Sequence, residues 1–276
     1  MSTQLTESVN PRSRDIDLKS IPEIIDIINA EDQLVANAVH AAREGIIKAV
    51  EAAVQSLNNG GRMIYIGAGT SGRLGVMDAV ECAPTYGMPY DRVFAIIAGG
   101  YDTMVKASEN AEDNVDAGIK AMDDNHVTAA DTIIGISASG NTPYVTGALK
   151  RARELGASTV GIICNANGTV ADAAEIPIIL LTGPEVITGS TRMKAGSAQK
   201  MTLNAISTTT MIRIGRVTGN FMTAMRPTNT KLRKRARFIV GSICGISEED
   251  ADSLLEQHNY VIRDSVNAWR KQETHP

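Results

Sequence analysis

The sequence is poor in aromatic residues, in cysteine and in long apolar stretches. Aromatic side chains make up 4% of the 276 residues, which argues against stacking surfaces for single-stranded nucleic acid. The three cysteines, Cys82, Cys164 and Cys244, are far apart and form no CxxC pair, a pattern typical of reduced thiols in a reducing compartment. No apolar run approaches the roughly 20 residues that span a bilayer, and the polar N-terminus lacks the apolar core of a signal peptide. We therefore expect a cytoplasmic protein without a membrane partner.

The chain also lacks an excess of positive charge and a metal-binding pattern. Its formal net charge is −4 at pH 7, which gives no general reason to expect nucleic acid or an anionic membrane as a partner. The four histidines are scattered, and neither an HExxH sequence nor a Cys/His cluster occurs. We expect a small-molecule partner and neither a metal nor another cofactor.

What the sequence does contain is an alternation of short apolar runs and amphipathic segments. Apolar runs that predict strands occur at 63–66, 93–98, 132–136, 159–164 and 176–181. The segments between them predict helices at about 72–82, 102–122, 143–155 and 168–174. Buried strands that alternate with helices are typical of a parallel sheet covered on both faces. The predicted fold class is α/β: a three-layer α/β/α sandwich with a central parallel sheet.

Helical patterns also flank this region. Apolar spacing predicts two helices between Ile21 and Asn58, with a break at 29–33, and another long helix from about Thr191 to Met211. A small helical segment follows, with turns at Gly245 and near Tyr260. We divide the chain into an N-terminal helical segment (1–58), the sheet domain (59–225) and a C-terminal helical segment (226–276).

The first predicted strand runs into a turn rich in glycine and hydroxyl groups, GAGTSG at 67–72. A strand that passes through glycines into a helix presents backbone N–H groups to an anion. The turn matches GxGxxG, but a dinucleotide site also needs an acidic residue about 20 positions further on. Arg92 stands there, and the next strand ends in Gly99-Gly100. The turn therefore predicts a phosphate site of another kind.

A second turn of this type, SASGNTP at 137–143, follows the third predicted strand. Both turns lie at the carboxyl ends of parallel strands, where ligands of open α/β sheets usually bind. The alternative is that these Ser and Thr residues only cap helices. We favour a shared phosphate site, whose candidate residues are Gly69, Thr70, Ser71, Ser137, Ser139, Gly140 and Thr142.

Two groups of carboxylates accompany the turns. Glu81 is predicted at the end of the helix that begins in the first turn, where a carboxylate meets the negative end of the helix dipole. An unfavourable placement of this kind marks a candidate functional residue. Glu109, Glu112 and Asp113 are predicted to lie on the helix after the second strand, and the spacing alone does not choose among them.

The motifs together resemble a known family. GTSGR and SASGNTP are similar to the paired loops of sugar isomerase (SIS) domains, which bind phosphosugars. IGAGTSGRLGVMDAVECAPTYG, EVITGSTRMKAGSAQKMTLNAIST and the MRPTN segment resemble the N-acetylmuramic acid 6-phosphate etherases, and the resemblance extends from about Leu5 to the end. The family reaction is elimination of a D-lactyl ether followed by addition of water. The resemblance implies that Glu81 protonates the leaving oxygen, that Glu112 is the base, and that the protein is a homodimer with a site near the interface.

The implied role of Glu81 has a physical requirement. A general acid must be protonated near neutral pH, whereas a free glutamate has a pKa near 4.3. We therefore expect Glu81 to lie in a partly apolar site.

The TGPEVITGSTRMKAG segment, which follows the last predicted strand, is interpreted as a loop that closes on the ligand. Ser190 or Thr191 is a good N-cap for the next helix. Arg192 and Lys194 are unfavourable to the helix dipole unless they meet an anion or a carboxylate. We favour Ser190 and Lys194 as ligand contacts. Departures from the family pattern, at Ala83, at Ser197 and at 223–224, leave Glu81, Glu112 and both turns unchanged.

Two other functions compete with the etherase. A phosphosugar-sensing regulatory protein without catalysis would need the two turns but neither glutamate. A phosphosugar isomerase would need a base but no acid dedicated to a leaving group. The basic run between Lys231 and Arg237 is interpreted as a solvated helix face or a subunit contact, because no helix-turn-helix pattern accompanies it.

Overall fold

The computed structural model describes residues 5–106, 108 and 110–274, and it divides into two compact units. The sheet unit comprises Met1–Ala79 and Asp91–Thr210, and the helical unit comprises Val80–Tyr90 and Met211–Pro276. Helices α4 and α8 run from one unit into the other. The predicted division at residues 58 and 225 stays a prediction.

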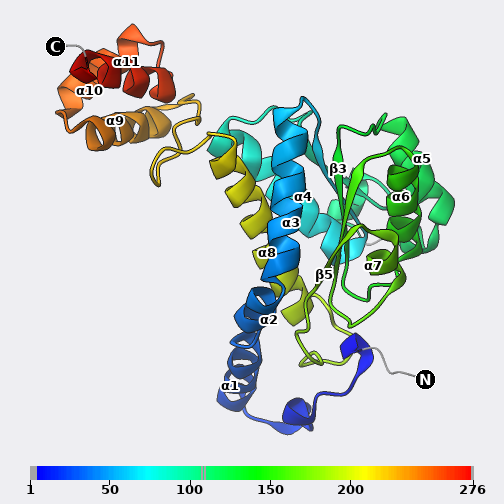
Figure 1. The fold of residues 1–276 in the computed structure, drawn as a ribbon. Helices are drawn as coiled ribbons and strands as arrows, with labels where there is room; N and C mark the ends of the chain where they lie inside the picture. The colour runs from blue at the N-terminus through cyan, green and yellow to red at the C-terminus, as the bar shows by residue number, and fades with distance from the viewer. Residues whose placement is uncertain (1–4, 107, 109, 275–276) are drawn as a thin grey trace. The chain divides into compact units, whose positions relative to one another are not determined.

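The sheet unit is built around five parallel strands (Figure 1). The strands are β1 (Met63–Gly67), β2 (Val93–Ile97), β3 (Thr132–Ser137), β4 (Ser158–Ile163) and β5 (Ile176–Ile179), in the spatial order β2-β1-β3-β4-β5. Its helices are α1 (Ile21–Asp32), α2 (Val35–Ala41), α3 (Arg43–Asn58), α4 (Gly69–Tyr86), α5 (Val115–Asp124), α6 (Pro143–Glu154), α7 (Thr169–Ala173) and α8 (Lys194–Arg213). Short 3-10 turns lie at η1 (Leu5–Glu7), η2 (Pro11–Ser13), η3 (Ile16–Leu18), η4 (Tyr101–Met104) and η5 (Ala111–Asp113). The predicted fold class is confirmed.

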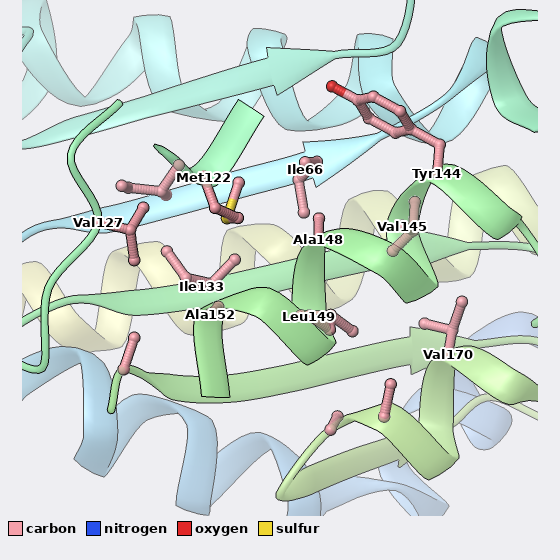
Figure 2. Packing of buried hydrophobic residues seen from close by; sticks show 14 of the residues in the cluster. Ile66, Met122, Val127, Ile133, Tyr144, Val145, Ala148, Leu149, Ala152 and Val170 are labelled. Carbon is pink, nitrogen blue, oxygen red and sulfur yellow. The ribbon is translucent and has the colours of Figure 1, made fainter. Parts of the chain in front are cut away.

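Alternation along the strands explains the three layers. Ile66 of β1 and Ile133 of β3 point into a core formed with α5, α6 and α7 (Figure 2), and Ile64 of β1 belongs to the same buried cluster. The intervening residues face the opposite side, where the Tyr65 side chain lies under Gly75 of α4 and Thr132 bonds to Ser56 of α3. Successive side chains of a strand point to opposite faces, so a strand covered on both faces is apolar throughout.

Close packing of α4 on β1 explains the third glycine of the GxGxxG match. A Cβ on Gly72 would lie 2.8 Å from the carbonyl oxygen of Gly67 and 2.7 Å from Ile97. These distances are too short for any side chain, and the Gly67 oxygen belongs to the backbone, which cannot move aside as a flexible side chain can. Gly72 is therefore needed for helix–strand contact, which is one of the glycine roles in dinucleotide-binding turns as well.

Three helix predictions need correction. The segment 102–122 is not one helix: Gly99, Gly100 and Asn110 have positive φ, and α5 begins only after Asn114, whose side chain accepts a bond from the Ala117 N–H. The N-terminal region forms three helices rather than two. Helix α4 is longer than predicted, since it continues through Pro84 to Tyr86.

The helical unit contains α9 (Thr230–Cys244), α10 (Glu248–Gln257) and α11 (Ile262–Thr274). They bury one cluster that includes Ile239, Leu255 and Ile262. The predicted turns occur where expected: Gly245 ends α9 with a φ of 69°, and Tyr260 also has a positive φ.

The buried ion pair between Arg62 and Asp131 joins the starts of β1 and β3. Asp131 accepts bonds from the Arg62 side chain, at 2.7 and 3.0 Å, and from the Arg62 and Thr128 N–H groups. Burial raises the pKa of Asp131, but the bonds from Arg62 and Thr128 outweigh it and hold this pKa below the usual 3.8. The pair therefore stabilises the fold above pH 3.8, and its contribution is lost as the pH falls through the lowered value.

Replacing Asp131 with Asn is expected to cost about 1.5–3 kcal/mol at pH 7, because a buried charge-assisted network is broken. The difference in unfolding free energy between this variant and the parent protein should become smaller below pH 3.8. Urea unfolding at pH 7 and pH 3.5 measures both effects. Asp123→Asn is the control, because the Asp123–Arg151 pair is exposed and should contribute about 0–1 kcal/mol. Equal losses for both variants would contradict the assignment.

Candidate functional site

The two predicted phosphate turns follow adjacent strands of the sheet. The strand order reverses between β1 and β3, which pair in register from Met63↔Thr132 to Gly67↔Ile136. Chains of this order bind ligands outside the carboxyl ends of the strands, at the point of reversal. The 67–72 turn leaves β1 at this point, and the 137–143 turn leaves β3 beside it. Topology therefore places both turns at the same edge.

The 137–143 turn gathers three hydroxyl groups. Ser137 Oγ lies 2.7 Å from Thr142 Oγ1 and 3.4 Å from Ser139 Oγ, and it accepts a bond from the Gly140 N–H. Gly140 has a φ of 77°, a conformation that favours glycine. The Asn141 N–H donates to Ser139 Oγ. Ser137 and Thr142 are buried, whereas Ser139 is half-buried. This concentration of donors suits the oxygens of a phosphate.

The 67–72 turn divides its polar groups between two tasks. Gly69 is exposed with a φ of 52°, and Thr70 is half-buried. Ser71 is buried, and its hydroxyl donates to Gln199 Oε1 of α8 at 2.9 Å. A phosphate oxygen would need to accept a hydrogen bond from Ser71. The Ser71 hydroxyl proton is already donated to Gln199, where it holds α4 to α8.

Glu112 lies at a pocket of about 240 Å³ beside this turn. The lining also includes Gly69 and Arg73, whose guanidinium donates to the Thr103 and Met104 carbonyl oxygens. Glu112 is exposed and belongs to η5 rather than to a helix, which corrects the predicted element. Asp113 shares this turn, and Glu109 lies outside the described residues.

Glu81 belongs to the helical unit and differs from its prediction in two ways. It lies five residues before the end of α4, so it is not a helix-end carboxylate. Its side chain is exposed, whereas a partly apolar site was expected. The reason is the continuation of α4 beyond Pro84, which leaves Glu81 on the surface of an ordinary helical turn.

The predicted ligand contact of Lys194 also needs correction. The Lys194 side chain is fully buried, and its Nζ donates to Glu31 of α1, which also pairs with Arg12. Burial raises the pKa of Glu31, but hydrogen bonds from Arg12, Lys194 and Asn10 outweigh it and lower this pKa to about 2. Lys194 therefore anchors α8 to α1 and does not reach solvent.

Helix α8 is capped by a residue that the sequence analysis passed over. The buried carboxylate of Glu185 accepts the N–H groups of Lys194 and Ala195, at 3.0 and 2.9 Å. Ser190 is half-buried in the preceding turn, and its N–H donates to the Ile187 carbonyl. Ser190 or Thr191 was expected to cap α8. Because α8 begins only at Lys194, neither residue directly precedes its first turn.

Two other cations, Arg192 and Lys200, lie next to the first turn. Arg192 and Lys200 line a pocket of about 290 Å³ together with Thr70 and Ser197. Both cations are exposed. This part of the sheet unit can therefore receive an anion.

The described part of the chain offers neither a metal site nor a membrane-spanning helix. Within it, no group of three or more His, Cys, Asp or Glu side chains could hold a metal ion. No helix there has both the length and the apolar character needed to cross a bilayer.

Two family models and several solved structures resemble this chain. The family model of the glucokinase regulatory protein N-terminal SIS domain matches residues 45–153, and that of the SIS domain matches residues 103–209. A phosphoheptose isomerase from Francisella tularensis has a TM-score of 0.54 at 17% identity, covering 70% of this chain and 99% of its own. One from Neisseria gonorrhoeae has a TM-score of 0.53 at 21% identity, covering 69% and 98%. These structures share the fold.

Three curated relatives extend over almost the whole sequence. Each bears the name N-acetylmuramic acid 6-phosphate etherase. The protein from Clostridium beijerinckii is 48% identical, over 94% of this chain and 85% of its own. That from Vibrio vulnificus is 49% identical over 93% and 85%, and that from Salmonella typhi is 45% identical over 96% and 90%.

The chain belongs to the N-acetylmuramic acid 6-phosphate etherase family. The family resemblance stated from the motifs is therefore confirmed.

This etherase-family chain holds its second turn with a residue that no motif indicated. Asn165, buried just beyond β4, donates to the Ser139 carbonyl oxygen at 2.8 Å. Its Oδ1 accepts the N–H groups of Leu5 and Thr6. The N-terminal segment and the Ser139 turn are thus tied to one side chain. The one signal in the sequence that could have suggested Asn165 is its side-chain amide, which can form several hydrogen bonds at once.

Replacing Asn165 with Ala is expected to loosen the Ser139 turn. The loss of several buried hydrogen bonds should cost about 1–3 kcal/mol of stability. If the turn binds substrate, KM should rise more than kcat falls. Asn165→Asp is the matched variant, because it keeps the acceptor for Leu5 and loses the donor to Ser139. An unchanged KM in both would show that the residue has no influence on the turn.

Proposed function

We propose that the chain cleaves the D-lactyl ether of N-acetylmuramic acid 6-phosphate, giving N-acetylglucosamine 6-phosphate and D-lactate. The observation that carries this proposal is 45–49% identity to the named etherases over 93–96% of the chain. The reaction would make the protein a carbon–oxygen lyase that serves amino sugar recycling, and we place it in the cytoplasm.

The phosphate is assigned to the edge between β1 and β3. Ser137, Ser139 and Thr142 supply hydroxyl groups there, and Gly140 supplies the left-handed backbone conformation that shapes the turn. The other candidates of the site are Gly69, Thr70, Ser71 and Ser190. Ser71 takes part only through its contact with Gln199. Thr70, beside Arg192 and Lys200, supports a place for the substrate's second anion, the lactyl carboxylate.

The two glutamates are assigned to proton transfer. With the sugar open and C1 an aldehyde, the C2 proton is acidic enough for a carboxylate base. Glu112 takes this proton, the C2–H electrons form a C2–C3 double bond, and the C3–O bond breaks. Glu81 donates a proton to the departing oxygen, which leaves as the hydroxyl of D-lactate. Water then adds its oxygen to C3, and a proton returns to C2.

We also propose that the protein is a homodimer. The support is apolar surface near the N-terminal helices, where the Leu18 and Ile21 side chains are 81% and 78% exposed. A groove of about 380 Å³ in the sheet unit is lined by Ile24, Ile28 and four other apolar residues, with Asp17 and Arg192 as its charged members. Sedimentation that shows only monomer at micromolar concentration would contradict this state.

One experiment tests the proposed reaction. The protein is incubated with N-acetylmuramic acid 6-phosphate in ¹⁸O-labelled water, and the products are analysed by mass spectrometry. The expected result is D-lactate without label and a sugar phosphate with ¹⁸O at C3. Label in lactate would indicate attack on the lactyl carbon instead. Tight binding without turnover would support a phosphosugar-sensing regulatory protein.

A further inference from the structure

The helical unit contains a pocket that the proposed reaction does not use. Its volume is about 690 Å³, within the range of sites for small molecules. Its lining residues come from several segments: Gly87 after α4, Arg216 after α8, the loop 223–228, the first turn of α9, the end of α10, and the stretch from Asn259 into the first turn of α11. This loop includes the first four residues of the MRPTN motif, which has no role in the proposed reaction.

The lining of this pocket is strongly basic. Arg216, Arg226, Arg233 and Arg263 all contribute to it, and among the described lining residues Glu256 is the single carboxylate. Four guanidinium groups against one carboxylate leave a net charge of +3. Like charges gathered around one cavity repel each other, and this repulsion is relieved when an anion enters.

Three of these arginines make no close ion pair with a described carboxylate. In the part of the chain that the structure describes, Arg226, Arg233 and Arg263 form no salt bridge within 4 Å, whereas nearby Arg237 pairs with Asp252. Arg263 is the second residue of α11, where the positive end of the helix dipole adds to the positive potential. These guanidinium groups therefore keep their donors for a ligand.

One arginine is also held in place. The Arg233 guanidinium lies over the Tyr260 ring at 4.7 Å from its centroid, and the Tyr260 hydroxyl donates to Asp252 at 2.8 Å. Stacking on an aromatic face restricts a guanidinium without using its N–H donors. Arg233 is thus oriented at the pocket before any ligand binds.

We propose that this pocket binds the phosphate group of a small phosphorylated sugar. Arginine forks match phosphate oxygens in pairs, and the volume exceeds what inorganic phosphate alone would fill. Glu256 can accept hydrogen bonds from sugar hydroxyl groups. The proposal concerns the helical unit and does not depend on the catalytic roles of Glu81 and Glu112.

The test compares two double variants of the full chain. Arg226→Gln/Arg263→Gln removes two charges from the pocket, and Lys231→Gln/Lys234→Gln removes two exposed charges of α9 that do not line it. Each protein also carries Ser139→Ala and Thr142→Ala, which disable the phosphate turn of the sheet unit. Inorganic phosphate is titrated by calorimetry at low ionic strength, and circular dichroism confirms that each protein is folded.

Phosphate is expected to bind the Ser139→Ala/Thr142→Ala protein, and the arginine variant should bind it about 100-fold more weakly, roughly tenfold for each charge-assisted contact. The lysine variant should differ by less than about threefold, because exposed charges are screened. Equal binding by both double variants, or no phosphate binding in this background, would overturn the proposal. Neither result bears on lactate release, which is measured separately.

A second titration identifies the source of the ligand. N-acetylglucosamine 6-phosphate that binds at least about tenfold more tightly than phosphate would support the pocket as a site for the reaction product. Equal affinities would support a different phosphorylated sugar. Unphosphorylated N-acetylglucosamine that binds as tightly as its 6-phosphate would overturn the assignment of phosphate as the recognised group.

Discussion

Glu81→Gln is expected to lower kcat for D-lactate release by about 10²–10⁴-fold, the usual contribution of a general acid. Glutamine keeps the size of the side chain and cannot donate a carboxylic proton. Because Glu81 is exposed, the substitution should leave the melting temperature unchanged. The loss of activity would then reflect the missing proton donor and not unfolding. A coupled lactate assay measures kcat.

Hydrogen exchange separates the two glutamates. In deuterated water, a base alone suffices to exchange the C2 proton of the bound substrate. Glu81→Gln should keep this exchange, which NMR detects, while it loses lactate release. Glu112→Gln should lose both. Asp113→Asn is the control, since Asp113 shares the η5 turn with Glu112. If Glu112→Gln still exchanges C2 and Asp113→Asn does not, the base is Asp113.

The second large effect is expected at Lys194. Lys194→Met should destabilise the protein by about 3–5 kcal/mol, because it leaves the buried Glu31 carboxylate without one of its partners. For a chain of this size the loss corresponds to a melting temperature lower by roughly 6–20 °C. Arg192→Gln is the matched control. Arg192 is exposed, so its replacement should change stability by less than about 0.5 kcal/mol.

The variants Lys194→Met and Arg192→Gln also distinguish a cation that stabilises the fold from one that binds the substrate. If the Thr70 pocket receives the lactyl carboxylate, Arg192→Gln should raise KM, and calorimetry should show weaker substrate binding. Adding Glu31→Gln to Lys194→Met should recover part of the lost stability, because the stranded charge is removed. If Lys194→Met instead had an unchanged melting temperature and a raised KM, Lys194 would be a ligand contact and not a structural residue.

The acidity of Glu31 gives this prediction a dependence on pH. Its pKa is lowered from 4.5 to about 2 in the folded chain. The carboxylate therefore contributes stability above pH 4.5, and this contribution is lost as the pH falls toward 2. In Lys194→Met the loss between pH 4.5 and pH 2 should be smaller, because less stabilisation remains to be lost.

The sheet was predictable because its signal is local. Runs such as Ile133-Ile134 are apolar on both faces, as expected for a strand covered by helices on both sides, and the ends of the strands were predicted within two residues. The positions of the two turns followed from the same runs. Gly72 was recognised as part of a GxGxxG match, but its contact with Gly67 is visible only when helix and strand are packed.

The errors concern residues whose partners are distant in sequence. Lys194 meets Glu31 across 163 positions, and Asn165 meets Leu5 across 160. No periodicity relates such residues. The exposure of Glu81 depends on whether α4 stops before Pro84 or passes through it. Proline usually disfavours the second outcome inside a helix, so the local rule gave the wrong end.

The bond between Leu5 and Asn165 also orders events during synthesis. The N-terminal segment leaves the ribosome first, yet its partners at Asn165, Pro184 and Val186 are made more than 150 residues later. At roughly 5–20 residues per second, that interval lasts about 8–35 s. Closing so long a loop is slow and costs chain entropy. The N-terminal segment therefore acquires these hydrogen bonds late, after the central strands can already have paired.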